Sequence, residues 1–443
     1  MMRVAVCSCL LGLVVASAAT AQAQGRRGRP APPANPGSGA AGAAGTAPDA
    51  VTDAAAPDTS ADTSPDTTPD AQDPAGEPAA GEPQTFPDEP VEATAEPEVM
   101  EISAARIKLS LNMFGDGSYA LSREASGDLH QEFILGALGL LARGELSPSL
   151  AGVMELVFEI DEDGATVADL ERLHITWKSP RFEAQAGRLH TPLGTWNDHY
   201  HHGLWLQLPV ERPYVLRFED DGGFLPIHWI GGLVTAHFDV GAGMRLNLTG
   251  GVGNGRGRIE DEILVAGDLD EAKAVIARVE LEQPGERHWR AGLSGVFDVI
   301  AGQPADVRPA LPDEDIFELL GNAFVNYRTE QLTVISEAYV VDHVIADQAW
   351  ISADVFALAG YSLGSFTPYV LVEWVDFFGG PDPFFVPDPI MSPPLPTALI
   401  EGLAGVRIDL TTWAALKGEL RVTHYTDAGV TTQGVTLNWA FGI

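Results

Sequence analysis

The stretch that decides the fold is Met154-Glu-Leu-Val-Phe-Glu-Ile160, in which a large apolar residue occupies every second position. In an extended chain, successive side chains point to opposite faces. Met154 and Ile160 therefore share an apolar face, and Glu155 and Glu159 lie on the opposite one. This period of two predicts a β-strand with one apolar and one polar face.

The same alternation recurs in segments far apart in the chain, near residues 106–113, 172–178, 245–249 and 416–423. The alternating runs reach about ten residues, which suits a tilted membrane-spanning strand and exceeds the ~5–6 residues usual for strands in soluble proteins. In a soluble sandwich the apolar faces would form the core. In an outer-membrane barrel they would contact lipid, and the polar faces would line a lumen.

The connections between the expected strands alternate in length, which decides between these two scaffolds. Tight turns are expected near 143–149, 179–181, 239–242, 284–287, 329–331, 362–365 and 411–413. Longer loops are expected near 115–129, 162–167, 190–226, 252–272, 300–317, 343–349, 378–400 and 426–430. Short turns at one end, long loops at the other and an even strand count are typical of bacterial outer-membrane barrels. Residues 102–443 are therefore predicted to form an all-β, antiparallel transmembrane barrel of about sixteen strands.

The last ten residues, Gly434–Ile443, agree with this prediction because Leu437, Trp439 and Phe441 fall on one apolar face. An apolar final strand resembles the assembly signal of outer-membrane barrels. The terminal Ile443 departs from the Phe that usually ends this signal.

One short segment carries a family resemblance. Gly187-Arg-Leu-His-Thr-Pro-Leu-Gly194, which follows an expected strand, resembles the GKFKTPFG-type segment of the phosphate-selective porin family. The resemblance implies a porin-like barrel with a loop folded into the pore. That family draws anions through ladders of Lys and Arg, whereas this chain has 62 Asp and Glu against 26 Lys and Arg. Phosphate selectivity is therefore not carried over.

The chain before the barrel has two further parts. Residues 1–23, with Arg3, an apolar run and Ala21-Gln-Ala23, have the pattern of a secretory signal peptide. Residues 24–101 are rich in Pro, Ala, Thr and acidic residues and predict a disordered linker, either a periplasmic spacer or docking tail or a segment with no specific partner. Both cysteines of the chain lie in the signal peptide, so the mature chain has no disulfide or cysteine chemistry.

The polar faces of the expected strands supply candidate pore-lining residues of both signs. They are Arg106, Lys108, Glu155, Glu159, Arg172, His174, Lys178, Arg245, Arg278, Glu280, Arg328, Arg407, Asp409, Lys417, Glu419 and Arg421. Such charges could form a constriction that orients polar solutes, or they could pair with one another in a plugged lumen. The net charge of −36 argues against a nucleic-acid partner and predicts a preference for cations.

The loop expected at 190–226 is the candidate constriction, because prolines stiffen it and its aromatic side chains would pack against a barrel wall. The constriction residues proposed from the sequence are His190, Trp196, Asp198, Trp205, Arg217, Glu219, Asp220 and Asp221. The acidic run within this set could bind calcium, although a turn rich in Asp and Gly explains it as well.

Three histidines of this loop suggest a transition-metal site. His199, His201 and His202 could bind zinc or copper if the backbone brought them together. Their spacing matches no defined metal motif, and hydrogen bonding within a packed loop is the alternative. No cofactor is otherwise expected.

These features favour an outer-membrane channel for passive diffusion of small hydrophilic solutes, in contact with outer-membrane lipid. The resemblance to porins implies a homotrimer, although the sequence itself shows no interface signature. A non-conducting anchoring barrel that binds a partner through its loops is a second hypothesis. A Ser–His enzyme using Ser294 or Ser336 is a third, although neither serine lies in a GxSxG elbow. The protein is therefore expected not to be an enzyme.

Overall fold

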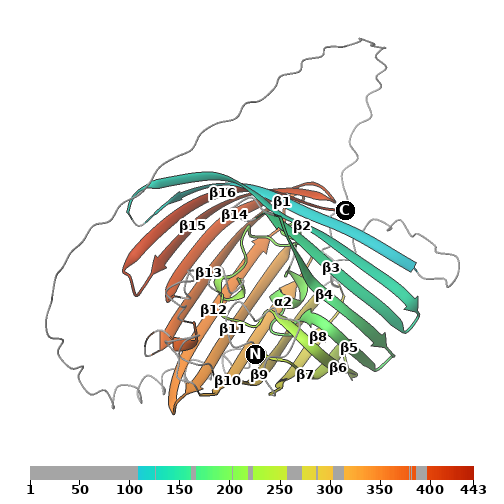
Figure 1. Ribbon diagram of the computed structural model, residues 1–443. Helices are drawn as coiled ribbons and strands as arrows, with labels where there is room; N and C mark the ends of the chain where they lie inside the picture. Colours follow the sequence, from blue (N-terminus) through green and yellow to red (C-terminus); the bar gives the residue numbers. More distant parts are fainter. Residues whose placement is uncertain are drawn as a thin grey trace, which may run out of the picture. The chain divides into compact units, whose positions relative to one another are not determined.

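A closed antiparallel barrel of sixteen strands forms the described part of the chain, and this confirms the predicted fold class (Figure 1). The computed structural model describes residues 108–124, 126–160, 166–201, 203–217, 223–256, 272–285, 288–302, 314–378, 380, 382–385 and 397–443. The predicted signal peptide, the predicted linker and Arg106 lie outside these residues.

Each strand pairs with its neighbours in sequence, and β1 pairs with β16 to close the sheet. The strands are β1 (Lys108–Arg123), β2 (Leu129–Ser147), β3 (Leu150–Ile160), β4 (Thr166–Lys178), β5 (Phe182–His190), β6 (His228–Gly241), β7 (Met244–Gly253), β8 (Ala274–Gln283), β9 (His288–Ile300), β10 (Ile316–Arg328), β11 (Leu332–Ile345), β12 (Gln348–Tyr361), β13 (Phe366–Phe378), β14 (Leu399–Thr411), β15 (Ala414–Tyr425) and β16 (Val430–Gly442). The short helices are α2 (Trp196–His199), η1 (Tyr214–Leu216) and η4 (Pro383–Phe385). Among the described residues, no helix combines the length and apolar character needed to cross a bilayer.

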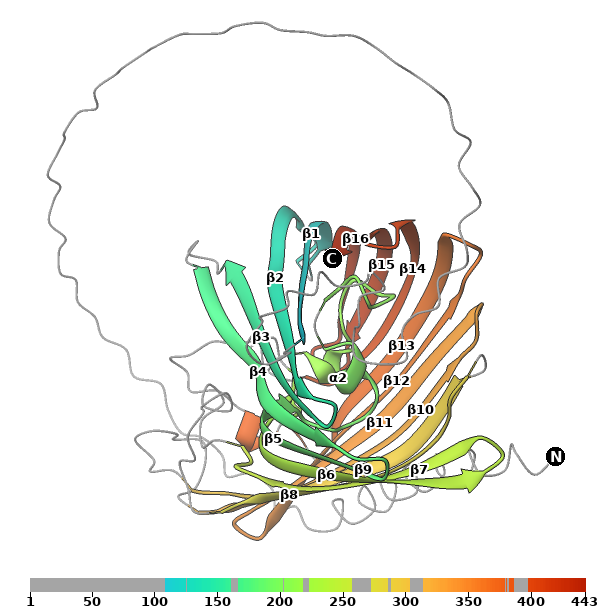
Figure 2. The ribbon, with the colours of Figure 1, turned by 90° about the vertical axis from the view of Figure 1, so that its right-hand side faces the viewer.

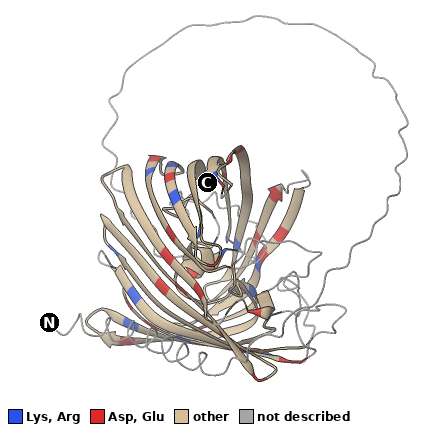
Figure 3. Cartoon of the chain, turned by 90° about the vertical axis from the view of Figure 1, so that its left-hand side faces the viewer, with Lys and Arg blue, Asp and Glu red and all other residues tan. Residues whose placement is uncertain are grey.

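The strands expose their apolar side chains on the outside of the barrel and turn their polar side chains inward. On β8, Val275 and Val279 are 49% and 50% exposed, whereas Arg278 and Glu280, on either side of Val279, are buried inside. Charged residues accordingly interrupt long uncharged stretches of the strands (Figure 3). An apolar outer surface of this kind suits contact with lipid chains.

Two loops predicted from the sequence are wrong. The loop expected at 343–349 is a two-residue turn, in which Ala346 and Asp347 take left-handed φ values of 50° and 63°. Such angles at both central positions are those of the type I′ turn, whose twist matches the flanking strands. The loop expected at 115–129 begins only after Arg123, because the glycines near its start belong to β1. At Gly117 a side chain would overlap the indole of Trp439 on the neighbouring strand.

The connection between β5 and β6 spans residues 191–227. Its described residues, 191–201, 203–217 and 223–227, fold into the lumen, and α2 lies between the barrel walls (Figure 2). Val215 and Phe224 of this connection are buried in one apolar cluster with Tyr339 and Phe356 of the wall. Phe384, in the connection after β13, belongs to the same cluster. A packed apolar core therefore fills part of the lumen, and it extends to Trp229 of β6, Ile276 of β8 and Val296 of β9.

Candidate functional site: an inward loop and the vestibule beside it

The inward loop (residues 191–227) begins at the segment Gly187–Gly194 that carries the family resemblance. Gly194 has a left-handed φ of 69°, and a side chain there would overlap the Glu337 carboxylate. Its backbone N–H donates to Oδ1 of Asn322 on β10 at 2.9 Å. Glycine thus allows the backbone to turn and to approach the wall closely.

Buried carboxylates of the wall hold the backbone N–H groups of the inward loop. Glu337 on β11 accepts hydrogen bonds from the backbone N–H groups of Thr195 and Trp196, at 2.7 and 2.8 Å, where α2 begins. Glu373 on β13 accepts from the N–H of Tyr214 at 2.8 Å. A charge-assisted bond to a helix N-terminus satisfies donors that the helix cannot satisfy itself.

Further along the wall, charged residues of β14 and β15 hold the loop in the same way. Glu419 accepts from the N–H of Val210 at 3.0 Å. Arg407 donates to the carbonyl of Gln207 at 3.1 Å, and the Lys417 ammonium donates to the carbonyl of Pro209 at 2.9 Å. Most of the loop's anchors thus lie across the lumen from its root at β5 and β6.

The candidate pore-lining residues of this side are therefore covered by the loop. Arg407, Lys417 and Glu419 are almost fully buried. Three further candidate pore-lining residues also have partners inside the barrel. Arg328 donates to the Tyr200 hydroxyl, and Asp409 pairs with Arg407 at 2.7 Å. Arg421 pairs with Glu211 at 2.7 Å and with Glu401 at 3.0 Å. Arg328, Arg407, Lys417, Glu419 and Arg421 thus bind the loop, whereas Asp409 pairs with Arg407 of its own strand.

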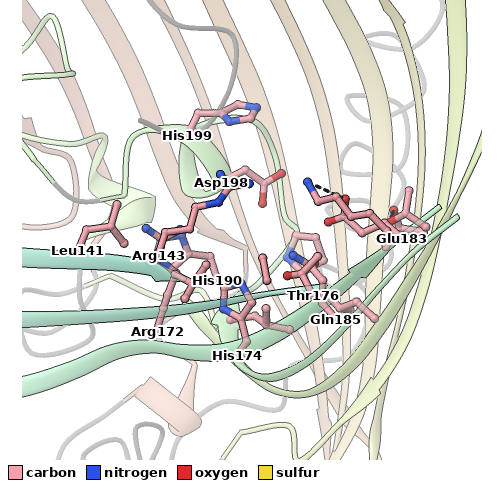
Figure 4. A pocket seen from close by; sticks show the side chains of 18 of the residues that line it. Leu141, Arg143, Arg172, His174, Thr176, Glu183, Gln185, His190, Asp198 and His199 are labelled. Carbon is pink, nitrogen blue, oxygen red and sulfur yellow. Dashed lines mark hydrogen bonds and ion pairs between the residues drawn. The ribbon is translucent and has the colours of Figure 1, made fainter. Parts of the chain in front are cut away.

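The other half of the barrel contains an open cavity of about 640 Å³, which we call the vestibule. It is lined by strands β1 to β9 and by the loop, and it includes Lys108, Arg172, His174, Lys178, Arg278 and Glu280 of the predicted set. Asp198 and His199 line it from the loop, whereas Arg143, Arg172 and His174 line it from the wall (Figure 4). The vestibule opens near the turn between β4 and β5, where Lys178 and Glu183 line it.

The described lining of the vestibule carries more positive than negative side chains. The six Lys and Arg residues are Lys108, Arg143, Arg172, Lys178, Arg278 and Arg290, and the four acids are Glu145, Glu183, Asp198 and Glu280. The acidity of the whole chain therefore does not extend to this cavity. Arg245 pairs with Glu282 at 3.6 Å and is not among the lining residues, and Glu159 lies at the exposed end of β3.

A narrower cavity of about 40 Å³, which we call the narrow passage, continues the vestibule. The two cavities share the lining residues Asn112, Leu141, Arg172, His190, Asp198 and His199. The narrow passage extends to Trp205 and to Gly442 near the chain end. It lies between the inward loop and the wall formed by β1 to β4 and the end of β16.

Ion pairs fix the charged groups at the narrow passage. Arg172 donates to Glu155 at 2.5 Å, Asp198 pairs with Arg278, and Arg290 donates to Nε2 of His199. Burial, together with the nearby Arg290 and Arg278, lowers the pKa of His199 well below its ordinary value. His199 is therefore a neutral hydrogen-bond acceptor at neutral pH.

The structure separates the other candidate residues of the loop. Trp196 lies in the apolar core with its ring 5.9 Å from that of Phe356, away from the narrow passage. Arg217 pairs with Glu211 at 2.9 Å on the far side. Glu219, Asp220 and Asp221 lie outside the described residues. His190, Asp198 and Trp205 line the narrow passage.

The predicted grouping of His199 with His201 is not found. His199 is directed toward Arg290, whereas His201 lies with His190 and His228, and His202 lies outside the described residues. Sequence reasoning missed His228, the first residue of β6. A register argument could have found it, because His190 and His228 are paired residues at the root of the loop.

The two serines of the enzyme hypothesis form hydrogen bonds with residues of the neighbouring strands. Ser294 donates to Oδ1 of Asn322 at 3.0 Å, and Ser336 donates to the backbone carbonyl of Phe356 at 2.9 Å. Both hydroxyls are thus engaged away from the histidines of the vestibule.

No protein-family model and no curated protein sequence matches the chain. Solved structures do match it. The anion-selective porin from Comamonas acidovorans has a TM-score of 0.52 at 13% identity, with 76% of this chain and 100% of the porin covered. OprB of Pseudomonas putida, in its high-pH structure, has a TM-score of 0.50 at 9% identity, with 76% of this chain and 94% of OprB covered. At such identities the likeness concerns the fold, and the chain has the closed sixteen-stranded barrel fold of bacterial outer-membrane porins.

Proposed function

We propose that this protein is an outer-membrane channel for passive diffusion of small hydrophilic solutes. The observation that carries the proposal is the polar vestibule, which continues into the narrow passage inside a barrel with an apolar exterior. Diffusion through such a path needs water, fixed charges and a limiting width, and it needs no catalytic group. We accordingly propose no enzymatic activity.

The positions of the vestibule and of β1 suggest how the barrel is oriented in the membrane. The vestibule opens near the short turns, which face the periplasm in bacterial barrels. The first described strand, β1, also begins at this end, because Lys108 pairs with Glu145 next to the turn after β2. We propose that residues 24–101 lie in the periplasm, that the outer face of the barrel contacts outer-membrane lipid, and that the barrels associate as a homotrimer. The protein mass within the protein–detergent complex, which should equal three chains, tests the trimer.

Conductance in a planar bilayer tests the channel directly. The refolded full chain is expected to give stepwise current increments in KCl. Migration that changes on heating in gel electrophoresis, as a closed barrel should show, serves as the assembly control. A correctly assembled barrel without any current steps would overturn the proposal.

The ion preference is expected to be weak. The negative charge of the whole chain draws cations toward the openings, whereas the surplus of Lys and Arg in the vestibule opposes them. The cation preference expected from composition thus has no support in the vestibule. Arg290 lines the vestibule. Because Arg290→Gln removes one of its positive charges, this variant should shift the reversal potential in asymmetric KCl toward cation selectivity.

A matched control is Arg245→Gln, on β7, which is separated from β9 and Arg290 by β8 and lies outside the vestibule lining. It should leave the reversal potential nearly unchanged, because a half-exposed charge paired with Glu282 is screened by solvent. Equal shifts in both variants would show that the vestibule does not set selectivity.

A non-conducting anchoring barrel is the second candidate. The apolar core favours it, because the loop fills this part of the lumen completely enough to bury Val215 and Phe224. The bilayer measurement distinguishes the two candidates, since an anchoring barrel would assemble and remain silent.

A further inference from the structure

We propose that His190, His201 and His228, together with Glu171, form a binding site for a divalent transition-metal ion of the Zn²⁺ type. The four residues come from three strands and the inward loop: Glu171 lies on β4, His190 ends β5, His228 begins β6, and His201 lies just after α2. The fold therefore brings together residues that are separated by up to 57 positions in the sequence.

The distances suit one shared ion. One ligand nitrogen from each of the three imidazoles lies within 4.8 Å of the other two. Oε2 of Glu171 lies 2.5 Å from Nε2 of His228 and 3.7 Å from Nε2 of His201. Neighbouring ligand atoms around tetrahedral zinc are roughly 3.3 Å apart, since each lies about 2.0–2.2 Å from the ion. Small side-chain rotations therefore suffice to place four donors around one ion.

The hydrogen bonds behind His201 fix which of its nitrogens can bind a metal. The Asn197 amide nitrogen donates to the backbone carbonyls of Thr191 and Ile227, both at 2.9 Å, so its Oδ1 is an acceptor. Nδ1 of His201 lies 2.9 Å from that oxygen and must carry the proton. In the neutral ring, Nε2 of His201 then directs its lone pair toward the cluster.

The Glu171 carboxylate lies beside two of the imidazoles. Its Oε2 is 3.7 Å from Nε2 of His201 and 2.5 Å from Nε2 of His228. A metal ion between the rings would bind the His201 nitrogen and the Glu171 oxygen together. A histidine whose other nitrogen donates to a fixed oxygen is the usual arrangement at metal sites, where that bond orients the ring.

Burial and access support the metal ion. The side chains of His201, His228 and Glu171 are 1%, 2% and 7% exposed, so the cluster is shielded from bulk water. His190 lines both the vestibule and the narrow passage, which gives an ion a route to the site. Three imidazoles and one carboxylate favour Zn²⁺, Ni²⁺ or Cu²⁺ over Ca²⁺ and Mg²⁺, which prefer oxygen ligands.

Occupation of the site would connect the inward loop to the wall at its root. His190 and His201 also line the narrow passage, so a bound ion would hold two sides of that passage together. This consequence rests on the proposed channel function, whereas the metal site itself does not.

Metal binding by the refolded full chain in metal-free buffer tests the site. Calorimetric titration with Zn²⁺ should give one ion per chain, and Co²⁺ should give the visible absorption of a tetrahedral nitrogen–oxygen site. Each of His201→Ala, His228→Ala and Glu171→Gln should weaken Zn²⁺ binding by at least about tenfold. Asn197→Ala removes the acceptor that orients His201 but none of the four ligands, and should therefore weaken binding less than His201→Ala does.

His237→Ala is the matched control, because His237 also lines the vestibule but bonds to Asn247 outside the cluster. Heat-modifiable migration confirms that each variant is assembled. The absence of a stoichiometric Zn²⁺ site in the assembled wild-type chain would overturn the proposal and identify a proton-linked cluster. Binding that survives both His201→Ala and His228→Ala would also overturn it, since the ion would then bind elsewhere. Neither result depends on conductance.

Discussion

Deletion of residues 197–207, with a short Gly-Ser linker in their place, is expected to raise single-channel conductance several-fold while the barrel still assembles. The deleted segment carries Asp198, His199 and Trp205, which form the loop side of the narrow passage. Their removal widens the space between the loop and the wall formed by β1 to β4, and conductance rises with the width of the narrowest part of the path. If the intact protein shows no conductance, the deletion variant should conduct.

Assembly should persist because the outer strands and part of the loop anchoring remain. The N–H groups of Thr195 and Trp196 keep their acceptor Glu337, and Tyr214 keeps Glu373. Trp205→Ala is the graded comparison, since it removes one ring of the narrow passage and should give a smaller increase. An assembled deletion variant with unchanged conductance would place the path elsewhere in the barrel.

Glu337→Ala is expected to release the start of the inward loop from the wall. The Glu337 carboxylate accepts from two backbone N–H groups of α2 and from the Tyr339 hydroxyl, all of them buried. Leaving such donors unsatisfied should weaken docking by about 3 kcal/mol, which corresponds to roughly 100-fold in the local opening equilibrium. Hydrogen exchange at Thr195 and Trp196, measured by mass spectrometry, should accelerate accordingly.

Two comparisons make this result specific. Glu337→Gln keeps an oxygen acceptor of similar shape and should accelerate exchange less. Glu282→Ala removes another interior carboxylate, one that pairs with Arg245 and Asn247 and not with the loop, and should leave exchange at α2 unchanged. Equal acceleration by Glu282→Ala and Glu337→Ala would show a general loosening of the barrel.

The strands could be predicted from the sequence because a barrel wall has only two environments. A period of two separates lipid-facing from interior residues, and it identified sixteen strands correctly. The errors arose where local composition conflicted with pairing. Gly115 and Gly117 suggested a loop, although their lack of side chains admits the rings of Phe441 and Trp439 from β16.

The contacts of the residues in the candidate site could not be predicted from this alternation. Alternation indicates that Lys178 and Lys417 both face the interior, but not what they meet there. Lys178 lines the vestibule, whereas Lys417 is buried against the carbonyl of Pro209, more than two hundred residues away in the sequence. The path of the inward loop, and with it the role of each interior charge, is a long-range property that no local pattern contains.

The apolar core within the lumen has a consequence for how the barrel forms. Its residues come from the inward loop, which follows β5, and from strands as late as β14, so it is complete only when most of the chain has been added. A wide barrel could close around water and admit a loop later. Here the loop reaches its buried position only together with strands as distant in sequence as β14. We therefore expect folding of the interior to be coupled to completion of the wall, and to be slow because its contacts are long-range.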